Sequence, residues 1–252
     1  MSMEKQKANA QVRPVTIRFP HVDNAGIVFY PRYIELLLKH FPDLPIFAAP
    51  TAFTLEFRRP NRLGDKIEIV SDYTVGSSEW YVAGRMNDDE YFTVRPLSPD
   101  TPTNPPIGYP ADDKVFATSD IPIGEWMSDR QGRMYLSRYF ETFNISVEKW
   151  FESTLNLPFH QLHVDRRVGI PTVRFQTKCR ELPRVGDDVT MLFRPVRIGS
   201  RSMTSRSWMI RGNECLVETE QVIVFVQMQE SGYETIEIPD YVRDAFAAQL
   251  KA

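Results

Sequence analysis

Two stretches of this sequence carry the same pattern of residues at the same spacing. Residues 23–35 read DNAGIVFYPRYIE and residues 129–141 read DRQGRMYLSRYFE, so each position of the first has a counterpart 106 positions later. An Asp, a Gly, a central aromatic residue, Arg-Tyr and a final Glu recur. Solenoid repeats have periods of about 20–50 residues, so a repeat this long predicts a duplicated module. Only the first copy keeps an apolar centre, AGIVFYP.

The strongest helix pattern of the chain follows the second copy. Between residues 137 and 155, large apolar residues recur at steps of three and four, which gives one apolar stripe. The first copy has a shorter version from Pro31 to Lys39, which Pro42 ends. Pro31 suits the start of a helix, because the N–H that proline lacks would have no partner inside the helix there. Each copy therefore predicts one helix.

Strand patterns follow both helices. Alternating residues run through 53–86 and through 172–210, and each run contains a Gly-Asp turn, RLGD at 62–65 or RVGD at 184–187. A Gly-Asp pair between alternating segments is typical of a β-hairpin. Each half of the chain is thus predicted to hold a loop, a helix and several antiparallel strands, which makes an α+β module.

A segment rich in Pro and Asp lies near the middle of the chain. Residues 97–113 read LSPDTPTNPPIGYPADD, a composition that excludes a helix or an interior strand. The alternating stretch at 114–123 resembles the last strand pattern of the second half, at 215–226. We therefore expect a first domain at 1–125, with 97–113 inserted before its last strand, and a second domain at 126–252.

Composition argues against several other classes of protein. A net charge of −3 in 252 residues argues against a general nucleic-acid-binding protein. The chain has no run of about 18 apolar residues and no apolar N-terminal stretch, so we expect no membrane span and a cytoplasmic location. Cys179 and Cys215 lie in strand patterns and are predicted to be reduced packing residues. The histidines share no ligand spacing with Cys or carboxylates, so we expect no metal site and no cofactor.

The first copy resembles a known family of enzymes. In hotdog-fold thioesterases of the 4-hydroxybenzoyl-CoA thioesterase type, an Asp-x-x-Gly-Ile-Val-aromatic-Tyr-Pro segment leads into the central helix, as DNAGIVFYP does here. The second half resembles the rest of that family through WFESTLNLPFHQL at 150–162 and the loop RIGSRS at 197–202. The resemblance implies a double hotdog, each half an antiparallel sheet wrapped around one central helix, with an acyl-CoA substrate. Association of such chains into homo-oligomers stays an open alternative.

The resemblance places the chemistry of thioester hydrolysis in the first copy. Asp23 is expected to act as general base for water or as nucleophile, and these two roles stay open. The family's oxyanion donor is a backbone N–H at the position of Tyr30, where the positive end of the predicted helix lies. Gly26 is expected to let the chain bend closely past the reacting carbonyl.

The second copy has lost the apolar part of the motif. Asp129 and Gly132 persist, but Arg130, Gln131 and Arg133 replace the apolar centre. A charged lining is a poor wall for an acyl pocket, so we expect Asp129 to pair with one of the two arginines and to contribute little to catalysis.

The loop after residue 194 carries several arginines among small polar residues. Arginine and serine side chains on a Gly turn suit phosphate groups, and the family holds the nucleotide of CoA near this loop. The residues predicted to bind substrate are Arg197, Gly199, Ser200, Arg201 and Ser202. A solvated strand face is the other interpretation, and it is favoured for Arg206. One composite site per chain would combine this loop with Asp23 and Tyr30.

Two other functions remain alternatives. Some hotdog proteins are hydratases or dehydratases with Asp, Asn-Pro and His near the helix, and this chain has Asn156, Pro158, His160 and Asp165. Leu157 splits the Asn-Pro pair, however, and the segment follows the predicted helix, whereas the signature precedes it. The third class is a protein that binds acyl-CoA without turnover.

Overall fold

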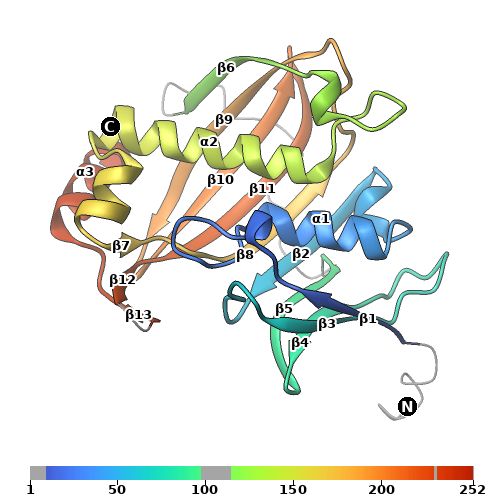
Figure 1. Cartoon of the computed structure of the whole chain (residues 1–252). Coiled ribbons are helices and arrows are strands. Elements are labelled where there is room, and N and C mark those ends of the chain that lie inside the picture. The colour runs from blue at the N-terminus through green and yellow to red at the C-terminus, as the bar shows by residue number, and fades with distance from the viewer. Residues whose placement is uncertain (1–9, 98–114, 230–231, 252) are drawn as a thin grey trace. The chain divides into compact units, whose positions relative to one another are not determined.

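The computed structural model describes residues 10–97, 115–229 and 232–251. The chain divides into two compact units: unit 1 comprises Met1–Pro102 and Gln176–Lys178, and unit 2 comprises Thr103–Phe175 and Cys179–Ala252. The predicted α+β class is confirmed, because each unit combines antiparallel strands with a helix (Figure 1). No helix in the described part of the chain is long and apolar enough to span a membrane.

Unit 1 is a five-stranded antiparallel sheet with one α-helix. Its strands are arranged in the order β1-β3-β4-β5-β2. The elements are β1 (Gln11–Thr16), the 3-10 helix η2 (Phe19–His21), α1 (Tyr30–His40), the 3-10 helix η3 (Pro45–Phe47), β2 (Thr51–Phe57), β3 (Lys66–Ser71), β4 (Val82–Met86) and β5 (Asp89–Pro96). Tyr33 of α1 packs on the sheet, since its ring lies 5.2 Å from that of Phe57 and 4.6 Å from that of Phe92.

Unit 2 repeats this plan and extends it. The strands of its main sheet are arranged in the order β8-β11-β10-β9-β6, and a small sheet adds β13-β12-β7. The elements are β6 (Phe116–Pro122), the 3-10 helix η4 (Glu125–Met127), α2 (Leu136–Leu155), the π-helix η5 (Gln161–Asp165), β7 (Val168–Gly169), β8 (Thr172–Cys179), β9 (Asp188–Ile198), β10 (Ser202–Arg211), β11 (Glu214–Val224), β12 (Val226–Gln229), β13 (Gly232–Thr235) and α3 (Asp240–Lys251).

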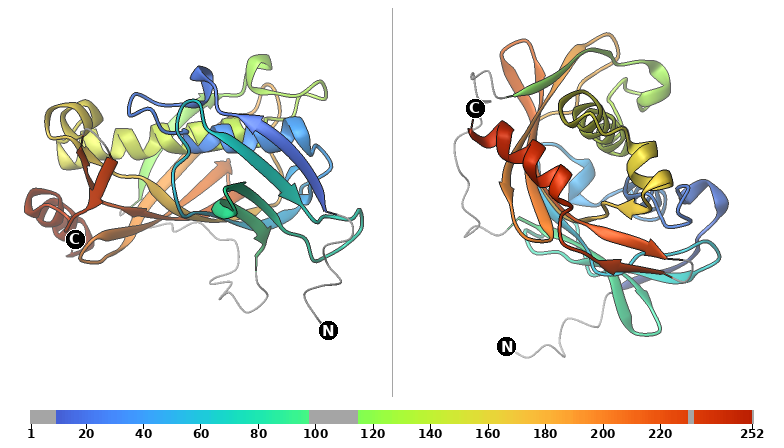
Figure 2. Two further views of the ribbon diagram at one scale, coloured as in Figure 1. Left: turned by 60° about the horizontal axis from the view of Figure 1, so that its bottom comes forward. Right: turned by 90° about the vertical axis from the view of Figure 1, so that its left-hand side faces the viewer.

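The long helix α2 forms the core of unit 2 with the main sheet. Its apolar stripe faces the strands, and the helix is seen nearly end-on beside them in the right-hand view of Figure 2. Phe143 and Trp150 of the helix meet the ring of Phe193 on β9 at 6.4 Å and 5.3 Å between ring centroids. Aromatic side chains bury the largest apolar areas, so this stripe dominates the stability of the unit. The helices predicted from periodicity are therefore confirmed, with α1 the shorter one.

The predicted boundary near Glu125 is wrong. The stretch 114–123 was expected to end the first half, but β6 pairs with β9 of unit 2, with Ile121 opposite Val189. Its counterpart in unit 1 is the first strand, β1, where Val15 pairs with Ile67 of β3. Alternation identified a strand but not its partner. Residues 97–113 therefore precede the first strand of unit 2, and all but Leu97 lie outside the described residues.

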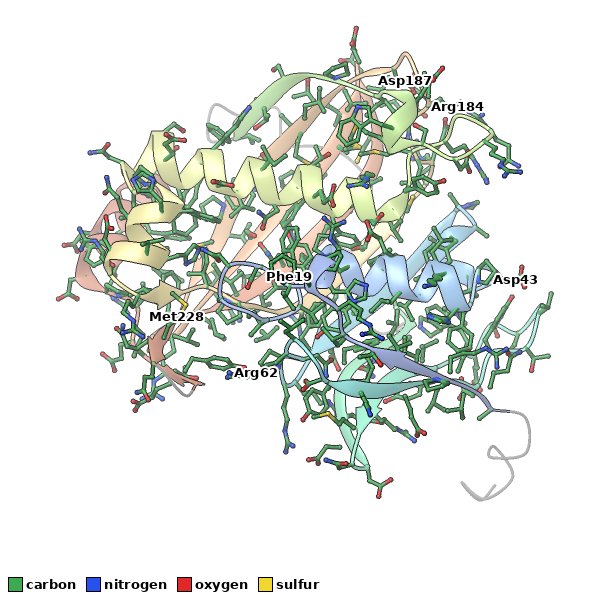
Figure 3. The ribbon with its side chains drawn as sticks, viewed as in Figure 1. Phe19, Asp43, Arg62, Arg184, Asp187 and Met228 are labelled. Atoms are coloured by element: carbon green, nitrogen blue, oxygen red, sulfur yellow. The ribbon has the colours of Figure 1, made fainter. Side chains whose placement is uncertain are left out.

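The two Gly-Asp turns do not connect paired strands, contrary to the hairpin prediction. In both units the strands that flank the turn are not neighbours in the sheet order. Each turn is instead closed by a hydrogen bond from its Arg to its Asp. The N–H of Arg62 donates to the Asp65 carboxylate at 2.8 Å, and the N–H of Arg184 donates to the Asp187 carboxylate at 2.8 Å. Arg184 and Asp187 lie close together just before the first residue of β9 (Figure 3).

Candidate functional site

The candidate centre of unit 1 is built on a turn closed by Asp23. One oxygen of its carboxylate, Oδ1, accepts hydrogen bonds from the backbone N–H groups of Ala25 at 2.9 Å and Ile27 at 3.3 Å. An Asp that binds the backbone two residues further on forms an Asx turn, which fixes the position of its carboxylate. Gly26 has φ +72°, a conformation that L side chains rarely adopt, and a Cβ there would meet no atom within 4 Å. Glycine is therefore required by the bend itself.

The motif is tied to the Gly-Asp turn of the same unit. Ile27 forms a bridge with Arg62, and the N–H of Val28 donates to the carbonyl of Asn61 at 2.9 Å. The motif then enters α1, whose first residue is Tyr30. The first N–H groups of a helix have no acceptor within the helix and carry its partial positive charge. This arrangement presents a carboxylate and a helix N-terminus from one continuous segment.

His21 has a structural role beside this motif. Its Nδ1 accepts a hydrogen bond from the N–H of Arg18 at 3.0 Å, and its carbonyl accepts one from the N–H of Phe29 at 3.1 Å. Burial lowers the pKa of His21 below its ordinary value, with Lys39, Arg32 and Arg18 acting in the same direction and Glu35 opposing them. The neutral ring, with Nδ1 as acceptor, suits the hydrogen bond that closes η2.

The same backbone recurs in unit 2, but its carboxylate is ion-paired. Asp129 Oδ1 accepts from the N–H groups of Gln131 at 2.8 Å and Arg133 at 2.9 Å, and Gly132 has φ +73°. The guanidinium of Arg133 binds the other oxygen, with Nε at 3.0 Å and Nη2 at 2.9 Å from Oδ2. Arg184 donates to the carbonyl of Gln131 at 3.3 Å. The predicted pairing of Asp129 with an arginine is confirmed, and the partner is Arg133.

The electrostatics of Asp129 follow from these contacts. Partial burial raises its pKa, but the N–H groups of Arg133 and Gln131 and the Arg133 guanidinium outweigh burial and hold the pKa below the ordinary value of 3.8. A carboxyl with a lowered pKa contributes stability above its unfolded pKa, and this contribution is lost as the pH falls through the folded pKa.

We expect the substitution Arg133→Met to raise the pKa of Asp129 towards its ordinary value, because the side-chain hydrogen bonds are removed while the N–H groups remain. A carboxyl-carbon NMR titration of Asp129 measures this shift directly. The variant should also lose less stability than the parent between about pH 4 and pH 2, since the contribution that acid removes is smaller. Arg130→Met, at an exposed neighbour, serves as control. An unchanged Asp129 titration in Arg133→Met would show that the backbone alone sets the pKa.

The arginine loop is the tight turn between β9 and β10 of unit 2. The N–H of Gly199 donates to the carbonyl of Ser202 at 2.8 Å, and Ile238 N–H donates to the carbonyl of Ser200 at 2.8 Å. Arg243 of α3 supports the loop, with Nη1 3.3 Å from the carbonyl oxygen of Gly199 and Nη2 3.1 Å from that of Ser200. Ile238 and Arg243, which lie near the C-terminus, thus hold the backbone of this loop in place.

The two arginines that were predicted to bind phosphate lie at the end of β9 and on this turn. Arg197 and Arg201 are both solvent-exposed, and no ion pair holds either guanidinium within the described part of the chain. Arg206 instead pairs with Glu220 across the neighbouring strands, with Nε 3.3 Å from Oε2. The strand-face interpretation favoured for Arg206 is confirmed.

Residues of the alternative dehydratase signature follow α2. Asn156 ends the helix in the left-handed conformation, with φ +50° and ψ +41°, and His160 is exposed. The nearby His163 has its Nδ1 2.7 Å from the carbonyl oxygen of Val168 and its ring 4.9 Å from that of Phe159. These contacts are those of a helix end and a packed loop.

The cysteines are buried packing residues, as predicted. Both are free, and burial raises the pKa of Cys179 to about 12 and that of Cys215 to about 11. A thiol with so high a pKa is a poor nucleophile at neutral pH.

The sequence analysis did not predict one buried polar pair of unit 1, which joins α1 to the residue before the Gly-Asp turn. The hydroxyl of Tyr33 donates to Oδ1 of Asn61 at 3.0 Å, and both side chains are buried. The only signal in the sequence is Asn61 itself, a polar residue beside the Gly-Asp turn where the second half has Pro183.

Comparison with known proteins identifies the fold. No protein-family model matches the sequence, and no curated protein matches it. Among solved structures, one described as an oleoyl thioesterase from Lactobacillus plantarum is 13% identical, with a TM-score of 0.65 over 89% of this chain and 98% of its own. The 12:0-ACP thioesterase from Umbellularia californica is 8% identical, with a TM-score of 0.61 over 86% of this chain and 94% of its own.

A smaller neighbour matches about half of the chain. A thioesterase superfamily protein from Jannaschia sp. CCS1 is 18% identical, with a TM-score of 0.50 over 56% of this chain and 96% of its own. About half of this chain covers almost all of this smaller structure, whereas most of the chain is needed to cover the two larger ones. A chain that contains two copies of one fold gives this result. The chain has the double hotdog fold that the repeat and the resemblance predicted.

Proposed function

We propose that this protein hydrolyses acyl-CoA thioesters, with its reaction centre in unit 1. The observation that carries the proposal is the likeness, over most of the chain, to two solved structures that are both described as thioesterases. The contrast between the two motifs supports the choice of unit: the Asp129 carboxylate is bound by a guanidinium, whereas the motif of Asp23 has apolar residues at the positions of Gln131 and Arg133.

The geometry of the motif supports the roles proposed for its residues. Asp23, fixed by its Asx turn, takes a proton from water as that water attacks the thioester carbonyl carbon, or attacks the carbon itself. The electron pair of the carbonyl bond moves to the oxygen, and the Tyr30 N–H at the start of α1 stabilises that charge. When the carbonyl re-forms, the C–S bond breaks and the CoA thiolate leaves. In the general-base route the thiolate takes the proton that Asp23 removed from water. In the nucleophilic route the acyl group stays on Asp23 as a mixed anhydride, which a water molecule hydrolyses to the free acid and the Asp23 carboxylate, and the proton released protonates the thiolate.

Release of free thiol from a panel of acyl- and aroyl-CoA thioesters tests this proposal. A thiol-reactive dye follows turnover directly, and isothermal titration with a non-hydrolysable thioether analogue measures binding separately. Hydrolysis of at least one thioester at a rate proportional to enzyme is the expected result. Binding of analogues without any turnover of the panel would assign the chain to the acyl-CoA-binding class. Water addition to an enoyl-CoA, with no thiol released, would favour the hydratase alternative.

Replacing Arg197 and Arg201 together by Ala is expected to raise KM for acyl-CoA by about tenfold or more, because the exposed loop would lose two guanidinium contacts to the phosphates of CoA. The matching acyl-pantetheine thioester has no nucleotide, so its kcat/KM should change little.

A matched control removes two arginines elsewhere. Arg59 and Arg95 of unit 1 pair with Asp89 and Glu56, and their replacement by Ala removes the same charge from the molecule. Equal losses for acyl-CoA and acyl-pantetheine in the loop variant would assign Arg197 and Arg201 to the fold and not to phosphate binding.

A further inference from the structure

The buried pair Tyr33–Asn61 leaves one hydrogen-bonding group without a partner. The Tyr33 hydroxyl lies 3.0 Å from Oδ1 of Asn61 and 3.2 Å from its backbone nitrogen. Asn61 is 0% exposed, and its Nδ2 has no hydrogen-bond partner among the described residues. Exchanging the amide oxygen and nitrogen does not solve this, since the hydroxyl would then meet Nδ2 and Oδ1 would be left. A buried amide group with no partner is destabilising, so its presence requires a reason.

Unit 2 shows that the fold does not require this amide. The N–H of Met134 donates to the carbonyl of Pro183 at 2.8 Å, as that of Val28 donates to the carbonyl of Asn61 at 2.9 Å. The two backbones are therefore equivalent at this point. In unit 2 the residue that supplies the carbonyl is Pro183, which has no side-chain amide.

The equivalent tyrosine of unit 2 also has a different partner. The hydroxyl of Tyr139 donates to Oγ1 of Thr219 on β11 at 2.7 Å, so this tyrosine is satisfied without an amide. Among the residues that the structure describes, the unpartnered amide thus belongs to the unit whose motif keeps its apolar centre.

The position of the amide relates it to the candidate centre of unit 1. Tyr33 lies three residues after Tyr30 in α1, which is about 4.5 Å along the helix axis. An acyl group whose carbonyl lies at the start of α1 and whose chain follows the helix would bring an atom a few bonds further on to the Tyr33–Asn61 pair.

We propose that Asn61 binds an oxygen atom of the acyl group through Nδ2, with Tyr33 holding the amide in place. The preferred substrates are then acyl thioesters that carry a hydroxyl or carbonyl oxygen a few bonds from the thioester, either on a short chain or on an aromatic ring. This inference rests on the proposed thioesterase function. Such a site selects against the unsubstituted analogue, because that analogue would leave the buried donor unpaired.

The test compares matched pairs of substrates. The wild-type chain is assayed with octanoyl-CoA against 3-hydroxyoctanoyl-CoA and 3-oxooctanoyl-CoA, and with benzoyl-CoA against its monohydroxy isomers. We expect at least one oxygen-bearing thioester to exceed its unsubstituted partner by about tenfold or more in kcat/KM. Thioether analogues of the same pairs give the difference in binding without turnover.

The variant Tyr33→Phe/Asn61→Leu removes both polar side chains, although it leaves the backbone N–H of residue 61 without the Tyr33 hydroxyl as acceptor, so some stability is lost. We expect it to lose the preference, so that kcat/KM for each oxygen-bearing substrate becomes about equal to that for its unsubstituted partner. Tyr33→Phe/Asn61→Pro, which places at position 61 the residue that unit 2 has and carries no N–H there to satisfy, replaces it should the first variant not fold. Asp129→Asn is the control variant and should keep the preference.

The outcomes separate this inference from the proposed function. A preference that survives in both double variants, or a wild-type chain that treats each pair equally, overturns the assignment of Asn61. An equal loss for all substrates would place the amide at the thioester carbonyl and also overturn it. If no thioester is hydrolysed but the thioether analogues still bind with the expected preference, the proposed hydrolysis fails and the binding site stands.

Discussion

Replacing Asp23 by Asn is expected to lower kcat for thioester hydrolysis by about a hundredfold or more, as for loss of a general base. The amide keeps the shape of the side chain and an Oδ1 that can accept from the N–H groups of Ala25 and Ile27, so the Asx turn should persist. What is lost is the negative oxygen that takes the proton of water or attacks the carbonyl carbon. Thiol release under saturating substrate measures the effect, and circular dichroism checks that the variant is folded.

Asp129→Asn is the matched control for this experiment, because both aspartates close the same turn. Its carboxylate is bound by Arg133, so we expect kcat to stay within about twofold of wild type while some stability is lost with the ion pair. A folded Asp23→Asn variant with near-normal turnover would remove Asp23 from the mechanism. Equal losses in the two variants would mean that both units carry working centres.

The duplication could be predicted from the sequence because its strongest signals are local. The Asp-x-x-Gly pattern specifies a turn within a few residues, and the apolar stripe of α2 specifies a helix. Strand pairing was predicted less well. The alternation at 114–123 looked like the end of a domain, although this strand starts unit 2 by pairing with β9. Alternation reports which side chains face the core, and it contains no information about which strand lies alongside.

The same distinction applies to the candidate site. An arginine partner for Asp129 could be predicted because Arg130 and Arg133 both lie within four residues of it, and the structure shows that the partner is Arg133. The partner of Tyr33 could not, since Asn61 lies 28 residues along the chain and reaches it only after the motif has folded onto the Gly-Asp turn. Long-range polar pairs of this kind depend on the tertiary structure, and no local pattern marks them.

A pair of core residues that differs between the units gives the second large effect. In unit 1, Gly84 on β4 lies opposite Phe92 on β5, and in unit 2, Met209 on β10 lies opposite Val217 on β11. In both hairpins the register shifts immediately after this pair. One unit thus combines no side chain with a large ring, and the other combines two side chains of intermediate size. Phe92, Met209 and Val217 are all fully buried, so each unit fills this part of its core with a different pair of residues.

Gly84→Ala is therefore expected to lower the free energy of unfolding by about 3 kcal/mol, at the upper end of the cost of overpacking. A Cβ at this position would lie 2.0 Å from Cε1 of Phe92, whose ring is fully buried and packed 4.6 Å from that of Tyr33. The ring has no room to move away without displacing α1. Urea unfolding of the full chain measures the loss.

The exchange Gly84→Met/Phe92→Val tests the cause, because it transfers the pair found in unit 2. Phe92→Val alone leaves a cavity and should cost about 2–4 kcal/mol, and Gly84→Met alone should cost at least as much as Gly84→Ala. Together they should cost well under the sum of the two, since the new side chain fills the space that the ring vacates. Full additivity would show that the Met side chain does not fill the space that the Phe92 ring vacates, and would overturn this explanation of Gly84. Phe92 contacts Tyr33, so the exchange should also alter the acyl preference attributed to Asn61. A variant that leaves the packing of Phe92 against Tyr33 unchanged should keep that preference.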